Sequence, residues 1–399
     1  MDDDARPGTS ASEALDHGVR RRPLPEGVEL RPFRDGDWER YLSVDERTFG
    51  YALEEDDLPA ETGVFEADRA LVADVDGVAT GNLGAYTLAL SVPGGAAVPT
   101  AGATWVGVLP TAQRRGVGRA LIEAHLADSR RRGDVLGALW ASQPGIYGRF
   151  GYGLAAWSQR IVVPAGGELD EAPHDPAVVV RFAEPADALP DISAVLAQVA
   201  LVRPGIPARD ERWWMRAQHD TPARRGGAGP LRYLVASDAD GPRGYVAFAT
   251  SLSWAPAGVP DGEVQVRELV AIDPAARAAL WRVLLGHDLM SRVEWWNAPV
   301  DEPLLTWRPD RSAVHSRRDT LFIRLLDLPA ALAARRFSTP LDVVLEVRDD
   351  LIPANAGRWR LVVDDDGSAT CAPAGAGAAP DLGLDVRELG AAYLGSSLL

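Results

Sequence analysis

The fold of this chain is decided by the stretch ATWVGVLPTAQRRGVGR, residues 103–119. Its first six residues form a short apolar run, which predicts a strand over residues 103–108. Two glycines, Gly116 and Gly118, follow a proline-containing turn, and a helical pattern of apolar residues then runs to about Arg132. We therefore expect a strand, a glycine-rich turn and a helix in direct succession.

A second buried strand completes this unit. Gly133 stands where a glycine commonly ends a helix, and residues 135–141 (VLGALWA) are apolar throughout. A strand, a crossover helix and a neighbouring strand predict an α/β (α+β) fold.

The turn from Gln113 to Gly118 is the strongest candidate for a ligand site. Its glycines let the backbone approach a ligand, the amides of the first helical turn lack partners, and the helix dipole favours negative charge there. A pyrophosphate fits this description, although a tight turn with solvated arginines explains a bare QxxGxG motif about equally well. A P-loop is excluded because the chain has no lysine, and the dinucleotide fingerprint is excluded because its third glycine is missing.

A second glycine-rich segment, SQPGIYGRFGYG (residues 142–153), directly follows the buried strand. Glycines every few residues indicate a tightly bent loop, and the loops after the strands of α/β proteins are where ligands usually bind. Taken alone, a tyrosine such as Tyr147 in this loop is more often a packing residue than a catalytic one.

The length and composition predict several domains. At about 150 residues per domain, 399 residues are enough for two or three. Residues 1–26 are acidic and aperiodic and are expected to form a mobile, disordered tail, and residues 164–177 are expected to form a linker. Residues 264–285 repeat the strand, proline turn and helix of residues 103–128 without the glycines and the arginine pair. We interpret them as a duplicated copy whose turn binds nothing.

Charge and residue usage exclude several function classes. The net charge of −16 argues against a nucleic-acid binder and favours cationic partners such as amines. The absence of lysine rules out Schiff-base catalysis, and the single cysteine rules out a disulfide or a multi-cysteine metal site. The six histidines are scattered without metal-binding spacing, so no metal is expected. No apolar run is long enough for a membrane span or a signal peptide, which predicts a cytoplasmic protein.

The two glycine-rich segments together resemble the GCN5-related N-acetyltransferases (GNAT), and within them the Eis (enhanced intracellular survival) family. Residues 106–119 and residues 145–153 (GIYGRFGYG) are very similar to the Eis pattern at the same separation. Two motifs in register are far more specific than either alone. The resemblance implies an acetyltransferase (GNAT) fold at 27–165, a degenerate GNAT-like domain at 175–328 and a sterol-carrier-protein-like α+β domain at 329–399.

The resemblance also implies an activity. It is acetyl transfer from acetyl-CoA to primary amines, either of small cationic, aminoglycoside-like molecules or of lysine side chains. Tyr147 matches the family's general acid, which protonates the departing thiolate, and Phe49 lies where the family has a pocket-lining aromatic residue. The residues implied to hold acetyl-CoA are Val106, Gly107 and Val108 through their backbone, the turn residues Arg114, Arg115, Gly116, Val117, Gly118 and Arg119, and Ser142 with Gln143 at the thioester. A homo-hexamer is implied as well.

The base that accepts the amine proton is the chain's own C-terminal carboxylate in the Eis family, which here would be that of Leu399. The sequence departs from the family pattern at this point, because it ends a few dozen residues earlier than expected and without the aromatic terminus. An incomplete C-terminal domain is therefore expected, and the role of Leu399 as base stays open.

Two alternatives to an active acetyltransferase stay open at this point. The sterol-carrier-like region could make the chain a lipid-binding module, and the shortened end could make it a catalytically inactive scaffold. The acidic run from Glu54 to Asp57 near Phe49 could attract amines, but a solvated helix face explains this run as well.

Overall fold

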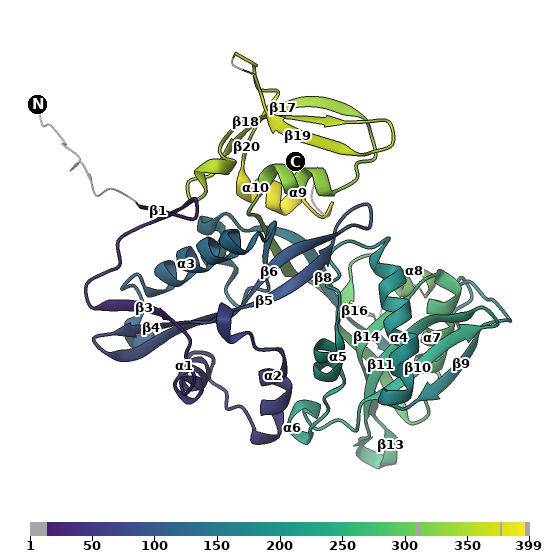
Figure 1. The fold of residues 1–399 in the computed structure, drawn as a ribbon. Coiled ribbons are helices and arrows are strands. Elements are labelled where there is room, and N and C mark those ends of the chain that lie inside the picture. The colour runs from purple at the N-terminus through teal and green to yellow at the C-terminus, as the bar shows by residue number, and fades with distance from the viewer. Residues whose placement is uncertain (1–13, 309–312, 376, 396–399) are drawn as a thin grey trace, which may run out of the picture.

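The computed structural model describes residues 14–308, 313–375 and 377–395, and one large sheet dominates it (Figure 1). In order across this 12-stranded sheet, the strands are β3 (Val28–Pro32), β4 (Leu71–Val75), β5 (Val78–Ser91), β6 (Ala97–Val108), β7 (Leu136–Leu139), β16 (Val314–Leu325), β8 (Gly153–Pro164), β15 (Met290–Pro299), β14 (Gly262–Ala271), β11 (Gly241–Ser251), β10 (Arg232–Asp238) and β9 (Val179–Ala183). Helices packed on this large sheet make the mixed α/β fold that the sequence predicts.

Helices cover both faces of each half of the sheet. They are α1 (Trp38–Phe49) and α3 (Val117–Arg132) in the first half, and α4 (Pro185–Ala200) and α7 (Pro274–Leu285) in the second. Val72 shares an apolar cluster with Tyr41 of α1, whereas its neighbour Ala73 shares one with Leu121 of α3. Since successive strand residues point to opposite faces, the two helices lie on opposite sides of the sheet. The same alternation at Leu234 and Val235 separates α7 from α4.

The two GNAT-like halves exchange their last strands. β16 belongs to the second half by sequence, yet it pairs antiparallel with β7 at Phe322↔Leu139 and with β8 at Phe322↔Leu154. β8, the last strand of the first half, pairs on its other side with β15. The predicted division between residues 165 and 175 therefore separates segments of the chain but does not separate two sheets.

Ordered structure begins closer to the N-terminus than the sequence predicts. The expected tail of residues 1–26 contains a hairpin of β1 (Ala14–Asp16) and β2 (Val19–Arg21), and residues 1–13 lie outside the described residues. Val19 is fully buried among the apolar side chains around α3, and the Arg20 amide donates to the Leu351 carbonyl at 2.7 Å. One buried valine and this backbone bond anchor a segment whose composition alone indicates disorder.

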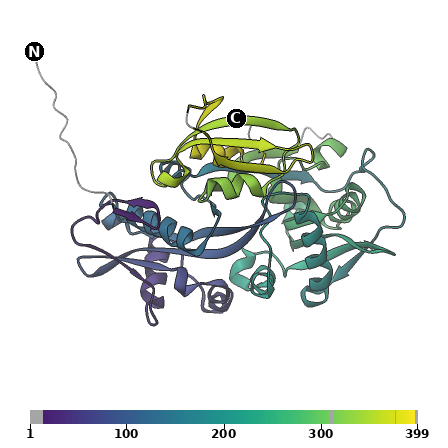
Figure 2. The same ribbon diagram turned by 45° about the horizontal axis from the view of Figure 1, so that its top comes forward.

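A third part of the chain forms a separate small sheet. It consists of α9 (Leu328–Ala334), β17 (Leu341–Arg348), β18 (Gly357–Val363), β19 (Ala369–Pro373), β20 (Leu382–Asp385) and α10 (Val386–Ala392), with sheet order β19-β18-β17-β20. This C-terminal domain lies over the junction of the two halves of the large sheet in both views (Figure 2). Its apolar side chains form one cluster with residues of β7 and β16, so the junction itself is a core.

Three short helices join the two halves on the other side of the sheet: α2 (Leu58–Val64), α5 (Glu211–Gln218) and α6 (Pro222–Arg225). The second half also contains α8 (Leu304–Trp307), which packs in its core, and the ribbon of β12 (Trp254–Ala255) with β13 (Val259–Pro260). Asp57, just before α2, is buried and accepts hydrogen bonds from Thr221 at 2.6 Å and Arg224 at 3.1 Å. Within the described ranges, no helix has the length and apolarity needed to cross a membrane.

Candidate active site

The site begins where β6 leaves its neighbour β7. The two strands pair in parallel only from Thr100↔Leu136 to Gly102↔Ala138, although β6 continues to Val108. On the β5 side the register shifts between Asn82 and Gly84, and Trp105 opposite this shift has a left-handed backbone with φ 52°. Such a bulge bends a strand away from its neighbour. Among the described residues, 103–108 therefore have no strand partner on the β7 side, which is where the sequence predicts that Val106, Gly107 and Val108 bind a ligand.

The N-terminus of α3 lies directly after this open edge. Its N-cap residue is Gly116 with φ 82°, and no side chain caps the helix. A Cβ at Gly118 would meet nothing closer than Val108 Cγ2 at 3.6 Å, so the backbone there is accessible. Unpaired amides with the positive end of the helix dipole form an anion site.

The predicted side chains of the turn differ in what they contact. Arg114 is exposed, has a left-handed backbone with φ 61°, and has no ion-pair partner in the described part of the chain. Arg115 lies 3.3 Å from Asp76, and Arg119 lies 3.2 Å from Glu123 within the same helix. Val117 is buried in the core, so only its backbone faces the turn. Arg114 and Arg115 are thus the exposed cations of the site.

The duplicated copy carries the same helix with its N-terminus closed. The side chain of Asp273 caps α7 by accepting from the Ala276 amide at 2.9 Å, and it also accepts from Arg243 at 2.8 Å. A carboxylate already occupies the place where an anion would bind. That the second turn binds nothing stays a prediction, which this cap favours.

Tyr147 lies in a 3₁₀ helix, η4 (Pro144–Phe150), between β7 and β8. Its side chain is 8% exposed and belongs to the same apolar cluster as Val106, Val108 and Val117. Burial raises the pKa of Tyr147 above its ordinary value, so the phenol keeps its proton at neutral pH. The structure therefore brings the predicted acid, the open strand edge and the helix start into one cluster.

The rest of the loop surrounds this tyrosine. Tyr152 is fully buried and contacts the Tyr147 ring edge-on, with ring centroids 6.2 Å apart. Ser142 and Gln143 are exposed at the start of the loop, where the sequence predicts the thioester end. Leu399, the predicted base, lies outside the described residues.

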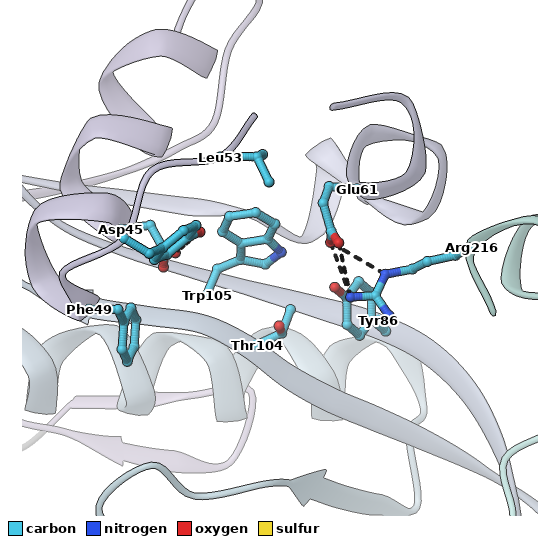
Figure 3. Close-up of a pocket in the computed structure, with 9 residues that line it drawn as sticks. Asp45, Phe49, Leu53, Glu61, Tyr86, Thr104, Trp105 and Arg216 are labelled. Atoms are coloured by element: carbon cyan, nitrogen blue, oxygen red, sulfur yellow. Dashed lines mark hydrogen bonds and ion pairs between the residues drawn. The ribbon is translucent and has the colours of Figure 1, made fainter. Parts of the chain in front are cut away.

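A pocket of about 280 Å³ opens beside the bulge of β6 (Figure 3). It is lined by Asp45, Phe49, Tyr51, Leu53, Glu61, Tyr86, Thr104, Trp105 and Arg216. Phe49 is the pocket-lining aromatic residue that the sequence predicts, and it comes from the last turn of α1. Four aromatic rings and two carboxylates give this pocket the chemistry of a site for cations.

The sequence alone did not indicate the two carboxylates of this pocket, Asp45 and Glu61. Asp45 accepts from the Tyr51 hydroxyl at 2.6 Å, its second oxygen has no partner among the described residues, and burial raises the pKa of its carboxyl. Figure 3 shows Glu61 facing Arg216, which donates to it at 3.1 Å. Asp45 precedes Phe49 by four residues, one helical turn, and that spacing is the signal that could have found it. The acidic run that the sequence singled out lies elsewhere, with residues 54–56 exposed.

Fold and site together define a GNAT-type acetyltransferase. The family model described as an acetyltransferase (GNAT) domain matches residues 29–155, and a second GNAT model matches residues 205–325. A sterol carrier protein domain model matches residues 328–398. These matches confirm the three-part fold expected from the sequence.

Comparison with whole proteins gives the family. The chain is 41% identical to an uncharacterized N-acetyltransferase of Streptomyces avermitilis over 92% of this chain and 90% of that protein. It is 33% identical to the N-acetyltransferase Eis of Mycobacterium tuberculosis over 77% and 74% of the two chains. The crystal structure of Eis1 from Mycobacterium abscessus superimposes with a TM-score of 0.73 at 31% identity, covering 93% of this chain and 90% of that one. The chain belongs to the Eis family of GCN5-related N-acetyltransferases.

The closed turn of the second copy gives a prediction about stability. Asp273→Ala should lower the free energy of unfolding by about 1–2 kcal/mol, because α7 loses its N-cap and Arg243 loses a partner. Urea unfolding measures this change, with exposed Asp288→Ala as the control. An unchanged midpoint would show that the cap does not stabilise α7, and calorimetry should find acetyl-CoA affinity unaltered in both variants.

Proposed function

We propose that this N-acetyltransferase transfers the acetyl group of acetyl-CoA to a primary amine of a small cationic, aminoglycoside-like molecule or of a lysine side chain. One observation carries the proposal: the unpaired edge of β6 runs from the Trp105 bulge toward the uncapped start of α3, with buried Tyr147 in the same cluster. An extended pantetheine arm can add to such an edge as a strand does.

The unpaired edge of β6 and the uncapped start of α3 supply the groups that a coenzyme A molecule needs. The backbone of Val106 to Val108 would bind the pantetheine arm, and the amides at 116–119 would bind the pyrophosphate with help from Arg114 and Arg115. Ser142 and Gln143 would line the thioester. Acetyl-CoA supplies the acetyl group in this activated form.

Proton transfer falls to Tyr147 in this proposal. An amine with a pKa near ~10 must be neutral before it attacks a thioester, and the sulfur of the leaving group must gain a proton. Because burial raises the Tyr147 pKa, the phenol is protonated and available to donate to that sulfur. The C-terminal carboxylate of Leu399 stays the expected base from the family resemblance.

The pocket beside Trp105 is the proposed acceptor site. Phe49, Tyr51 and Tyr86 would contact the body of the acceptor, and the Asp45 carboxylate that lines the pocket would attract an ammonium group. We expect the enzyme to act in the cytoplasm as a homo-hexamer, as the resemblance implies, and to use neither a metal nor a nucleic acid.

Lipid binding by the C-terminal domain is less well supported. Leu345 and Val347 of β17 share one apolar cluster with Leu332 of α9 and Leu389 of α10. This face of the small sheet is therefore used for packing, and the two helices and the large sheet cover it.

Removing the phenol tests the catalytic role. Tyr147→Phe should lower kcat on an amine acceptor at least ~10²-fold and leave acetyl-CoA affinity nearly intact, because only the proton donor is lost. Steady-state kinetics and calorimetry measure the two quantities. Equal turnover would remove Tyr147 from the mechanism, and Tyr233→Phe is a control at a buried tyrosine of the second half.

Filling the helix start tests the cofactor site. Gly116→Glu should abolish acetyl-CoA binding, because its carboxylate occupies the anion site and repels phosphate. Gly116→Ala is the matched control, since both variants share the strain of φ 82° and the contact of a Cβ with Pro25 at 2.8 Å. If calorimetry finds equal affinity in the two variants, the charge at this position is irrelevant and the proposed site is wrong.

Neutralising the buried carboxylate tests the acceptor pocket. Asp45→Asn should raise KM for a diamine about 10-fold or more, because a buried charge-assisted hydrogen bond is lost. The wild-type KM should fall as pH rises through the raised pKa of Asp45, since the carboxylate is charged only above it, and the variant should lack this step. Exposed Glu55→Gln is the control. A KM with the same pH dependence in Asp45→Asn would exclude the residue from acceptor binding.

A further inference from the structure

Three glycines in and directly after the Tyr147 loop, Gly148, Gly151 and Gly153, lie against the C-terminal domain. A Cβ at Gly148 would lie 3.1 Å from the Arg387 guanidinium, and one at Gly153 would lie 2.0 Å from the Arg387 carbonyl oxygen. From the other side, a Cβ at Gly390 of α10 would lie 2.3 Å from the Ile323 carbonyl oxygen and 3.2 Å from the Gly153 amide. The loop and α10 therefore touch backbone to backbone, which only glycine permits.

Arg324 of β16 lies beneath the same loop and is fully buried. Its Nη2 donates to both oxygens of Asp349 at 2.8 and 3.0 Å, and Asp349 follows β17 in the C-terminal domain. Asp349 also accepts from the Ile352 amide at 2.9 Å and from Asn355 Nδ2 at 3.1 Å. The Asp349 carboxylate is thus held by residues of the C-terminal domain, and it in turn fixes the Arg324 guanidinium of the large sheet.

The remaining donors of Arg324 face the loop. A Cβ at Gly151 would lie 1.6 Å from Nη1, so the guanidinium fills the space where a side chain would be. Nε and Nη1 have no hydrogen-bond partner among the described residues. Buried donors without partners cost free energy, so this placement is not explained by stability alone.

The contact between Arg324 and Gly151 is one residue away from a neighbour of the proposed acid, Tyr147. Tyr152 follows Gly151, is fully buried and contacts the Tyr147 ring. Burial raises the pKa of Tyr152 and the nearby Arg324 charge opposes this rise, whereas burial alone raises the pKa of Tyr147. Any influence of Arg324 on Tyr147 would therefore be on the position of its ring, through Tyr152 and the loop.

We propose that Arg324 is a positioning residue for acetyl transfer. Held by Asp349, its guanidinium supports the loop at Gly151 and fixes where the Tyr147 hydroxyl lies. Docking of the C-terminal domain, through Asp349 and α10, thereby sets the geometry of the proton donor. This inference rests on the proposed role of Tyr147.

Arg324→Lys is the variant that tests it in the full-length chain. The lysine keeps a buried ion pair with Asp349 but loses the planar group under Gly151. We expect kcat to fall about 10- to 100-fold, because small displacements of a reacting group cost that much. KM for acetyl-CoA and the pH dependence of kcat should stay unchanged.

The matched control is Arg69→Lys. Arg69 is also buried and pairs with buried Asp134, which precedes β7, whereas the loop follows the other end of that strand. Both variants should lose similar thermal stability, but Arg69→Lys should keep wild-type kcat. If the two variants lose kcat equally, Arg324 acts only through stability and the inference is overturned.

A second pair of variants tests the docking of α10 directly. Gly390→Ala drives a methyl group into the Ile323 carbonyl and should lower kcat with acetyl-CoA affinity preserved. Gly383→Ala in β20 meets nothing within 4 Å and should leave kcat unchanged. Wild-type kcat in Gly390→Ala would show that the loop does not depend on this contact.

Combining variants separates this inference from the proposed function. Arg324→Lys in a Tyr147→Phe background should cause no further loss of kcat, because residues that act as one unit are not additive. A multiplicative loss would overturn the positioning role. Wild-type turnover in Tyr147→Phe alone would instead refute the proposed function, and a loss there with wild-type kcat in Arg324→Lys refutes only the inference.

Discussion

The structure depends on the pairing of β16 between β7 and β8. Buried strands must satisfy their backbone hydrogen bonds, and β7 has β6 on one side only as far as Gly102. β16 supplies its other edge and at the same time joins the first half of the chain to the second. The same strand carries Arg324 to the C-terminal domain. All three parts of the chain therefore meet at one strand, and the Tyr147 loop lies at that meeting point.

The two copies of this fold differ in how the start of the helix after the turn is capped. In the first copy, the turn between strand and helix leads into a helix without a side-chain cap. In the second copy, Asp273 caps the corresponding helix. A carboxylate at an N-cap stabilises a helix and excludes an external anion for the same electrostatic reason. The first copy gives up that stabilisation at Gly116, as expected where a backbone is kept free for a ligand.

The sequence predicted more of the fold than of the site. The strand, glycine turn and helix and the duplication could be predicted because their patterns are local. The buried strand predicted over residues 135–141 is shorter, Leu136–Leu139, and Trp140 is exposed beyond its end. The hairpin around Val19, the strand exchange and the Asp45 pocket could not be predicted, since each depends on partners distant in the sequence. The glycines of residues 145–153 were attributed to a bent loop at a ligand site. The structure gives Gly148, Gly151 and Gly153 a second reason, the close approach of α10 and Arg324.

The sequence by itself determined the family and the open helix start, because two motifs at a fixed separation and an uncapped Gly116 are local properties. Only the tertiary structure decided which carboxylates face the pocket and what supports the tyrosine. Asp45 and Glu61 line the pocket because the fold places them beside Trp105. Arg324 is held in place by its hydrogen bond to Asp349. Burial and long-range contact are properties of packing, and no periodicity along a single chain encodes which distant residue will fill a given space.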